Sequence, residues 1–241
     1  MTRCNGRKAE LRVATWNVVS LPGRLVAVCR RARRLGIQIL CLQEVRVPPS
    51  QRKAVISLAG KFGWTLHLSD ELADKQGNPT AGTAILERVG AMHAESDFGM
   101  PGRVCRVKME TKDGPLDVYS VYIHASEHQD GTMLIEAILE SSAAKAETAI
   151  ILGDWNREPM DYPLGRALRT QHWNCLDDLS QSFKTRGNTG YLDYAIASDG
   201  IVATDRSQHC PFWSDHDLVA YNVDLCLKGT KRVKPRPKQF E

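Results

Sequence analysis

Residues 149–156 read Ala-Ile-Ile-Leu-Gly-Asp-Trp-Asn, an apolar run that ends in a glycine, a carboxylate, an indole and an amide. The run is short and is followed by a turn-forming residue, which predicts a buried strand. Asp154 and Asn156 then leave the strand on one loop, where a carboxylate can align or deprotonate an attacking water and an amide can donate to a phosphate oxygen. The alternative is a simple turn, because glycine, aspartate and asparagine favour turns for local reasons.

Two other stretches have the same construction. The apolar run Ile37–Leu42 leads into Glu44, and the triplet Ser-Asp-His at 214–216 precedes the apolar run Leu218–Val223. A lone carboxylate at a strand end can hold Mg²⁺, which takes one or two protein carboxylates and keeps water and phosphate oxygens as its other ligands. An exposed glutamate without a role is the alternative for Glu44. Together, carboxylates, an amide and an imidazole at strand ends predict metal-assisted attack on a phosphoester.

His216 needs a partner that fixes its tautomer and supports a charged imidazolium. Asp193, within the triplet Leu-Asp-Tyr at 192–194, is the expected partner from a neighbouring strand. Asp215 is then available to a metal ion, directly or through water. The alternative for His216 is a core histidine that is hydrogen-bonded but has no catalytic role.

Asn17 and Tyr122 also lie at the ends of predicted strands. The Asn17 amide can orient a catalytic carboxylate or contact the phosphate, and a turn residue is the alternative. The Tyr122 phenol can donate to a phosphate oxygen, and a packed core tyrosine is the alternative. Both residues are candidates for the same site.

Apolar periodicity predicts that strands and helices alternate along the chain. The predicted strands are 11–18, 37–42, 64–68, 82–86, 104–109, 116–123, 149–152, 192–197 and 218–225. The predicted helices are 24–35, 51–62, 133–145 and 164–170, and a turn is expected at Gly114-Pro115. Consecutive strands within 82–123 and alternation elsewhere favour an α/β fold with a mixed sheet and helices outside. We expect one domain over residues 9–227.

The composition is that of an ordinary globular protein, and it argues against several classes. No apolar run approaches the length of about 20 residues that a membrane span needs, and the first residues lack the apolar stretch of a secretory signal. The seven cysteines are odd in number and form no CxxC pair, so neither a disulfide framework nor a zinc site is expected. Four are expected to be buried thiols of an intracellular protein: Cys29, Cys41, Cys105 and Cys226.

Positive charge is concentrated near the C-terminal end. Of the 32 lysines and arginines, six lie in residues 227–241, which contain only one of the 28 acidic residues. The rest of the chain therefore has one more acidic than basic residue, so global charge is weak support for nucleic-acid binding by the body of the protein. Residues 228–241 have no apolar periodicity, and we expect a basic, disordered tail. A nuclear location is an expectation from this tail alone.

The strand-end motifs form an ordered set. The chain contains, in this order, Thr-Trp-Asn (15–17), Leu-Gln-Glu (42–44), Gly-Thr-Ala-Ile-Leu (82–86), Tyr122, Gly-Asp-Trp-Asn (153–156), Leu-Asp-Tyr (192–194) and Ser-Asp-His (214–216). This set resembles the endonuclease/exonuclease/phosphatase superfamily, and the likeness runs from about residue 11 to residue 225. The resemblance implies a four-layered α/β sandwich, with two mixed β-sheets flanked by helices, and a phosphoesterase that uses Mg²⁺ or Mn²⁺.

The resemblance also implies a role for each matching residue. On the metal side, Glu44 would be the principal ligand of the ion, with Asn17 beside it and Asp215 completing the set. The resemblance also implies five catalytic residues. Asp154 and Asn156 would position the water and stabilise the transition state. His216, held by Asp193, would contact the phosphate, and Tyr122 would match the family's phosphate-contacting tyrosine.

Two positions depart from the abasic-site endonucleases of the superfamily. Those enzymes have an aspartate two positions after the asparagine of the first motif, where this chain has Val19. They also have an asparagine three positions after the tyrosine, where this chain has Ala125. Both departures speak against abasic-site repair. The short span from Asp154 to Asp193, including a small segment at 186–191, resembles the endonuclease domains of non-LTR retrotransposons.

We therefore expect a metal-dependent phosphodiesterase that nicks DNA by in-line attack of water, as a monomeric catalytic domain with no membrane partner. In a domain of the retrotransposon kind, the basic tail would begin a linker to further domains of a polyprotein. A phosphatase or phosphodiesterase for an inositol phosphate or phospholipid is the first alternative, because the body of the chain is nearly neutral. An inactive nucleic-acid-binding remnant of the fold is the second, and the intact acidic residues and His216 speak against it.

Overall fold

The computed structural model describes residues 10–70, 79–94, 100–111, 114–126, 128–144, 148–170, 172–177, 192–210 and 213–224. The predictions for residues 186–191, for Cys226 and for the basic tail 228–241 lie outside the described residues. Within these ranges, no helix is long and apolar enough to cross a membrane.

Two six-stranded sheets form the centre of the protein. The first has the strand order β11 (Ala203–His209), β12 (Leu218–Asp224), β1 (Glu10–Asn17), β2 (Ile39–Gln43), β4 (Thr83–Glu87) and β3 (Thr65–Leu68). The second has the order β5 (Met92–Ala94), β6 (Val104–Thr111), β7 (Gly114–Tyr122), β8 (Thr148–Asp154), β10 (Asp193–Ser198) and β9 (Trp173–Cys175).

The two sheets repeat one pattern of strand directions. In each, a parallel pair lies between antiparallel pairs, and the parallel strands are β1 with β2 and β7 with β8. Between these parallel strands the chain forms α1 (Leu25–Arg34) and α3 (His128–Ala144). Parallel neighbours end at the same edge of a sheet. Each sheet therefore brings the ends of two strands together, which places Asn17 near the residues after β2 and Tyr122 opposite Asp154.

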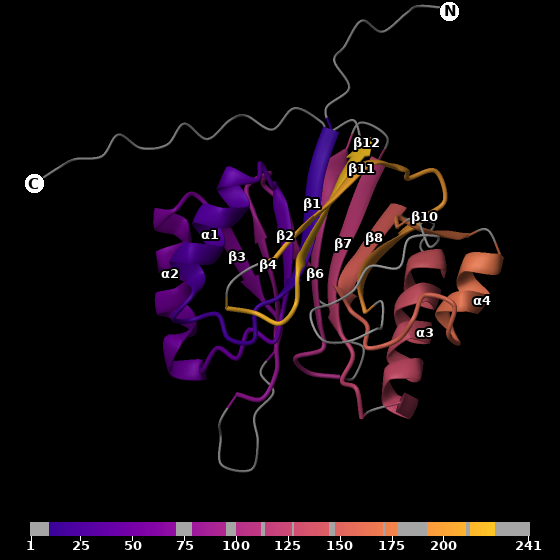
Figure 1. Cartoon of the computed structure of the whole chain (residues 1–241), viewed down its shortest axis with the longest axis horizontal. Helices are drawn as coiled ribbons and strands as arrows, with labels where there is room; N and C mark the ends of the chain where they lie inside the picture. Colours follow the sequence, from indigo (N-terminus) through magenta and orange to yellow (C-terminus); the bar gives the residue numbers. More distant parts are fainter. Residues whose placement is uncertain are drawn as a thin grey trace, which may run out of the picture.

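Helices cover the outer faces of both sheets, so the protein has four layers (Figure 1). α1 packs on the first sheet with α2 (Arg52–Lys61), which follows the 3₁₀ turn η1 (Pro49–Gln51). α3 packs on the second sheet with α4 (Leu164–Arg169). The predicted α/β sandwich of two mixed sheets flanked by helices is confirmed.

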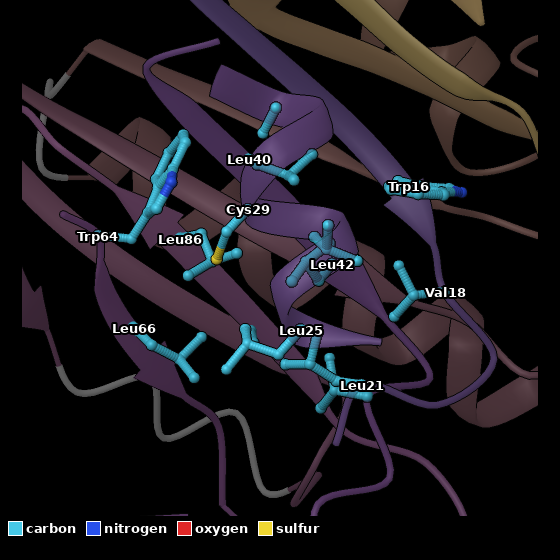
Figure 2. Packing of buried hydrophobic residues seen from close by; sticks show 14 of the residues in the cluster. Trp16, Val18, Leu21, Leu25, Cys29, Leu40, Leu42, Trp64, Leu66 and Leu86 are labelled. Atoms are coloured by element: carbon cyan, nitrogen blue, oxygen red, sulfur yellow. The ribbon is translucent and has the colours of Figure 1, made fainter. Parts of the chain in front are cut away.

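Three apolar clusters join the layers. The cluster between the sheets contains inward-facing side chains such as Val13 and Ile150. The cluster beneath α1 and α2 is drawn in Figure 2, where Cys29 of α1 lies near Leu86 of β4 and Leu25 lies near Leu21. Leu25 and Cys29 are one turn apart, which is the spacing that a helix needs to bury one face. The third cluster lies between the second sheet and its helices.

The cysteines of the described ranges are free thiols. Cys29, Cys41 and Cys105 are buried, as predicted. Burial raises the pKa of Cys105 to about 12, which keeps this thiol protonated and unreactive.

Three strands are absent from the sequence prediction. β5 and β9 have three residues each and are too short to form an apolar pattern. β11 reads Ala-Thr-Asp-Arg-Ser-Gln-His and shows no apolar alternation, because it is an edge strand whose residues are all at least partly exposed. Its pairing with β12 gives it its place in the sheet.

Two predicted boundaries are wrong. α3 begins at His128 rather than at 133 and includes Gly131. A Cβ at Gly131 would lie 2.6 Å from Cγ2 of Ile123, so the glycine allows close packing on the end of β7 and is not a helix breaker. The residues Gly114-Pro115, predicted as a turn, already belong to β7, where Gly114 pairs with Thr111.

Candidate active site

The inward-facing side chains become polar toward one end of the two sheets. In β1, Val13 is followed on the same face by Thr15 and Asn17, since alternate residues of a strand share a face. Thr15 Oγ1 donates to Gln43 Oε1 at 3.2 Å, and Gln43 Nε2 donates to Ser120 Oγ of the other sheet at 3.1 Å. These hydrogen bonds join the sheets one step below the site residues and fix the spacing between them.

Sequence reasoning assigned no role to this buried polar layer. Thr15 and Ser120 each stand two positions before a predicted site residue, in strands that are otherwise largely apolar. Both side chains are fully buried, and buried polar groups require partners. A polar residue on the same strand face as a site residue is therefore the signal that could have identified the layer.

Asn17 links the two sheets at the end of β1. Its Nδ2 donates to Glu44 Oε1 at 2.9 Å and to Asp154 Oδ2 at 3.0 Å. Its Oδ1 accepts the backbone N–H of Val19 at 3.0 Å, which fixes the orientation of the amide. One fully buried amide thus holds a carboxylate from each sheet.

Glu44 follows β2 with a backbone φ of 51°, in the left-handed region that non-glycine residues rarely adopt. Its Oε1 accepts the Tyr122 hydroxyl at 3.1 Å in addition to the Asn17 amide. Its Oε2 accepts a hydrogen bond from the guanidinium of Arg46. The Glu44 side chain is 15% exposed, so its carboxylate is held from three sides and still reaches the surface.

Asp154 ends β8 opposite Asp193 in the paired strand β10. Gly153 allows this approach, because a Cβ there would overlap the carbonyl oxygen of Val121. The backbone of β8 therefore packs directly on the end of β7, which sets the position of the Asp154 carboxylate.

Gly153→Ala is expected to destabilise the protein by about 3 kcal/mol, since the added methyl must displace backbone atoms in a packed sheet. Urea unfolding measures this change. Gly60→Ala is the matched control, because no atom lies within 4 Å of a Cβ there and alanine is favoured in the interior of α2. Equal stability of the Gly153→Ala variant and wild type would contradict the close approach.

Asn156 is anchored beside Asp154. Its backbone N–H donates to Asp154 Oδ1 at 3.2 Å, and its Nδ2 donates to the carbonyl of Ile123 at 2.7 Å. The intervening Trp155 is buried and its ring stacks on Tyr194, with the ring centroids 5.4 Å apart. These contacts hold the loop, and one hydrogen of the Asn156 amide is used for this.

His216 lies against Asp193, with 2.7 Å between Nδ1 and Oδ2. Its other ring nitrogen, Nε2, is 3.9 Å from Asp154 Oδ2. Ser214 fixes the backbone of this loop, because its Oγ accepts the His216 N–H at 3.1 Å and donates to the carbonyl of Asn17 at 2.7 Å. The imidazole thus stands between two buried carboxylates.

These contacts shift the pKa values of the three groups in different ways. Burial, together with the charge of Asp193, raises the pKa of Asp154 to about 7, while His216 and Asn17 oppose the rise. Burial alone would lower the pKa of His216, but the hydrogen bond and charge of Asp193 and the charge of Asp154 raise it to about 9. Burial and the charges of Glu44 and Asp154 raise the pKa of Tyr122. At neutral pH the site therefore offers an imidazolium and a neutral phenol as donors.

Asp193→Asn is expected to lower the pKa of His216 from about 9 to below about 7, because the variant keeps a polar partner but loses its charge. An NMR titration of the imidazole measures this. A histidine pKa raised from 6.5 contributes stability that is complete below pH 6.5 and is lost as the pH rises through about 9. The wild type should thus lose stability over that range and the variant should not. Titration of His216 at the same pH in both proteins would contradict the assignment.

Among the described residues, two groups of side chains have atoms that suit a divalent ion. Asp154, Asp193 and His216 each offer one ligand atom, and these atoms lie within 4.8 Å of one another. A metal-bound imidazole must be neutral, and because the pKa of His216 is raised to about 9, a proton competes with an ion for this ring at neutral pH. Glu44 offers hard carboxylate oxygen atoms, which suit Mg²⁺ and Mn²⁺ without loss of a histidine proton, while the Asn17 amide turns its NH₂ group toward this carboxylate. The donor chemistry at Glu44 therefore fits such an ion better.

Asp215 stands apart from Glu44 in its contacts. Its side chain is exposed, and its charge helps to raise the pKa of His216. Asn17, Glu44, Tyr122 and Asp154 are joined directly by hydrogen bonds, whereas Asp215 acts on the site through its charge.

Comparison of the sequence with known families shows to which family the chain belongs. The sequence profile of the Endonuclease/Exonuclease/phosphatase family matches residues 14–216. The chain belongs to this family. Members of the endonuclease/exonuclease/phosphatase family hydrolyse phosphoester bonds, which is the chemistry that the strand-end residues predict. A search of curated protein sequences gives no significant match.

Solved structures of the endonuclease/exonuclease/phosphatase fold resemble the protein over most of its length. The human Nocturnin catalytic domain with bound sulfate is 15% identical, with a TM-score of 0.67 over 90% of this chain and 94% of that chain. An AP endonuclease from Archaeoglobus fulgidus is 17% identical, with a TM-score of 0.65 over 88% and 98%. A 3′ phosphatase from Neisseria bound to a product DNA hairpin is 17% identical, with a TM-score of 0.66 over 88% and 98%. At these identities the likeness establishes the fold.

Proposed function

We propose that the protein is a Mg²⁺- or Mn²⁺-dependent phosphodiesterase that nicks DNA. The observation that carries this proposal is the Asn17 amide, which holds Glu44 of one sheet and Asp154 of the other within hydrogen-bonding distance. The amide holds two carboxylates beside an imidazolium. The carboxylate oxygens can bind a cation, and the imidazolium N–H can donate to a phosphate at the same place.

Glu44 would be the principal metal ligand, with Asn17 beside it and with Asp215 contributing through water from the exposed loop. When bound there, the ion would neutralise charge on a phosphate oxygen and so favour attack on phosphorus. Asn17 and Tyr122 keep the Glu44 carboxylate in one orientation through hydrogen bonds to Oε1.

Asp154 is proposed to align and deprotonate the attacking water. Its raised pKa of about 7 makes it a stronger base than an ordinary aspartate at a pH where much of it is ionised. The nearby His216, protonated and held by Asp193, would donate from Nε2 to a phosphate oxygen that gains charge in the transition state. Asn156 would add a further donor, and its anchored loop keeps the amide in position. Tyr122 would add another by turning its single hydroxyl hydrogen from Glu44 to the phosphate.

DNA is the preferred substrate because of what the related structures act on. One neighbour is an AP endonuclease and another is a 3′ phosphatase bound to product DNA. Val19 and Ala125 replace the residues that abasic-site enzymes of the family carry, so we propose general nicking of DNA rather than abasic-site repair. The short span from Asp154 to Asp193 favours an endonuclease of the non-LTR retrotransposon kind, which would act as a monomeric domain of a larger polyprotein.

The second candidate function is hydrolysis of an inositol phosphate or phospholipid. The chain outside residues 227–241 is nearly neutral, which permits a small phosphate substrate as readily as a polyanion. An inactive DNA-binding remnant is disfavoured, because the hydrogen bonds among Asn17, Glu44 and Asp154 are all intact.

A substrate panel tests the proposal. Supercoiled, abasic and single-stranded DNA, RNA and an inositol phosphate are incubated with the protein in Mg²⁺ or in EDTA. We expect nicking of supercoiled DNA in Mg²⁺, with little preference for abasic sites. Hydrolysis of the inositol phosphate without nicking would overturn the DNA assignment in favour of the second candidate.

A further inference from the structure

Arg46 is a cation built into the candidate metal site. Its guanidinium donates to Glu44 Oε2, while the other oxygen of that carboxylate is taken by Asn17 and Tyr122. An arginine does not lose its proton at any pH that a folded protein experiences. Glu44 is therefore neutralised by the protein itself, on the oxygen that is otherwise open to an ion.

The backbone brings this guanidinium to the carboxylate. Glu44 and Arg46 both have left-handed φ values, 51° and 44°, and the residue between them, Val45, donates its N–H to the carbonyl of Gly82 at 3.0 Å. The Arg46 N–H donates to the carbonyl of Ala81 at 3.0 Å. Left-handed non-glycine residues cost free energy and persist only where the surroundings hold them, as they do at functional sites. Residues 44–46 are thus clamped against residues 81–82.

Exposure distinguishes the two partners. The Arg46 side chain is 41% exposed, whereas that of Glu44 is 15% exposed. Glu44 is fixed by the buried Asn17 amide, whereas the Arg46 side chain is partly exposed and its Nε is buried without a hydrogen-bond partner among the described residues. A partly exposed guanidinium with an Nε–H that has no partner in the described part of the chain retains donors that suit a phosphate.

From these contacts we infer that Arg46 competes with the divalent ion for Glu44 and that, once displaced, it binds a phosphate of the substrate backbone. This inference rests on the proposed function and assigns a further residue to that site. Ion binding and phosphate binding are then coupled, because the ion frees the cation that holds the phosphate. Arg46 lowers the intrinsic affinity for the ion and raises the affinity for substrate once the ion is bound.

The first test measures binding of Mn²⁺ alone by calorimetry. Arg46→Gln is expected to tighten Mn²⁺ binding about fivefold, the factor that a partly exposed ion pair is worth. Arg46→Lys, which keeps the charge, should remain close to wild type. In a Glu44→Gln background, Arg46→Gln should produce no further change in Mn²⁺ affinity, because the carboxylate for which Arg46 and the ion compete is absent. Arg34→Gln, on the exposed face of α1, is the matched control.

The second test measures binding of a DNA duplex to the inactive Asp154→Asn protein in Mg²⁺ over a range of salt. Arg46→Gln should reduce the slope of log Kd against log salt by about 1, the loss of one phosphate contact. Unchanged or weaker Mn²⁺ binding in Arg46→Gln, or an unchanged salt slope, overturns the inference. If wild type binds Mn²⁺ but does not bind DNA, the proposed function fails, and the calorimetric result still tests the competition.

Discussion

Asp154→Asn is expected to reduce the rate of Mg²⁺-dependent DNA nicking by about 1,000-fold or more, in the upper range that a lost general base costs. The asparagine keeps the size of the side chain and an oxygen that can accept the Asn17 amide at this position. It cannot take a proton from water. Single-turnover nicking of supercoiled plasmid measures the loss.

The stability of the same variant distinguishes loss of the base from misfolding. The pKa of Asp154 is raised to about 7, so the cost of its buried charge appears as the pH rises from about 4 to 7. Asp154→Asn removes that cost and should be at least as stable as wild type at pH 8. Asp199→Asn, at the exposed far end of β10, is the control and should keep full activity. Substantial nicking by a folded Asp154→Asn protein would exclude Asp154 as the base.

Glu44→Gln is expected to reduce nicking about 100-fold or more at moderate Mg²⁺, because the variant loses the charge that holds the ion while retaining an oxygen for Asn17 and Tyr122. Calorimetry with Mg²⁺ should give weaker binding. High Mg²⁺ should restore part of the activity of Glu44→Gln but none of that of Asp154→Asn, since only the former loses ion affinity.

Glu158→Gln is the matched control for this prediction, because Glu158 is exposed on the loop after Asn156. Wild-type affinity for Mg²⁺ in Glu44→Gln would contradict the choice of Glu44 as the principal ligand. The ion would then be expected at Asp154, Asp193 and His216, whose ligand atoms lie within 4.8 Å of one another.

Much of the fold could be predicted from local pattern. Short apolar runs such as 149–152 become buried strands because both faces of each sheet are covered. Their polar end residues converge because neighbouring parallel strands end at one edge of a sheet, and this brings Asn17 close to Glu44. The pairing of His216 with Asp193 also follows a chemical requirement, since an imidazole between carboxylates needs a partner for Nδ1.

Other features depend on tertiary structure and have no local signal. The contact of Arg46 with Glu44 requires two left-handed residues in a run of non-glycine residues, and only the clamp against residues 81–82 maintains them. The bond from Gln43 to Ser120 depends on how the two sheets face each other. β11 is polar after Ala203 and becomes a strand because β12 offers it a partner. Asp215 is exposed although its sequence neighbour His216 is hydrogen-bonded to Asp193, a difference that the sequence does not indicate.

The most direct test of the central claim is the rate at which the wild-type protein nicks supercoiled plasmid DNA as Mg²⁺ is titrated from zero. The Asn17-linked pair of Glu44 and Asp154 predicts no nicking in EDTA and a rate that rises with Mg²⁺ to a plateau as the ion site fills. Equal nicking in EDTA and in Mg²⁺, or intact plasmid at saturating Mg²⁺ with folded protein, would contradict it.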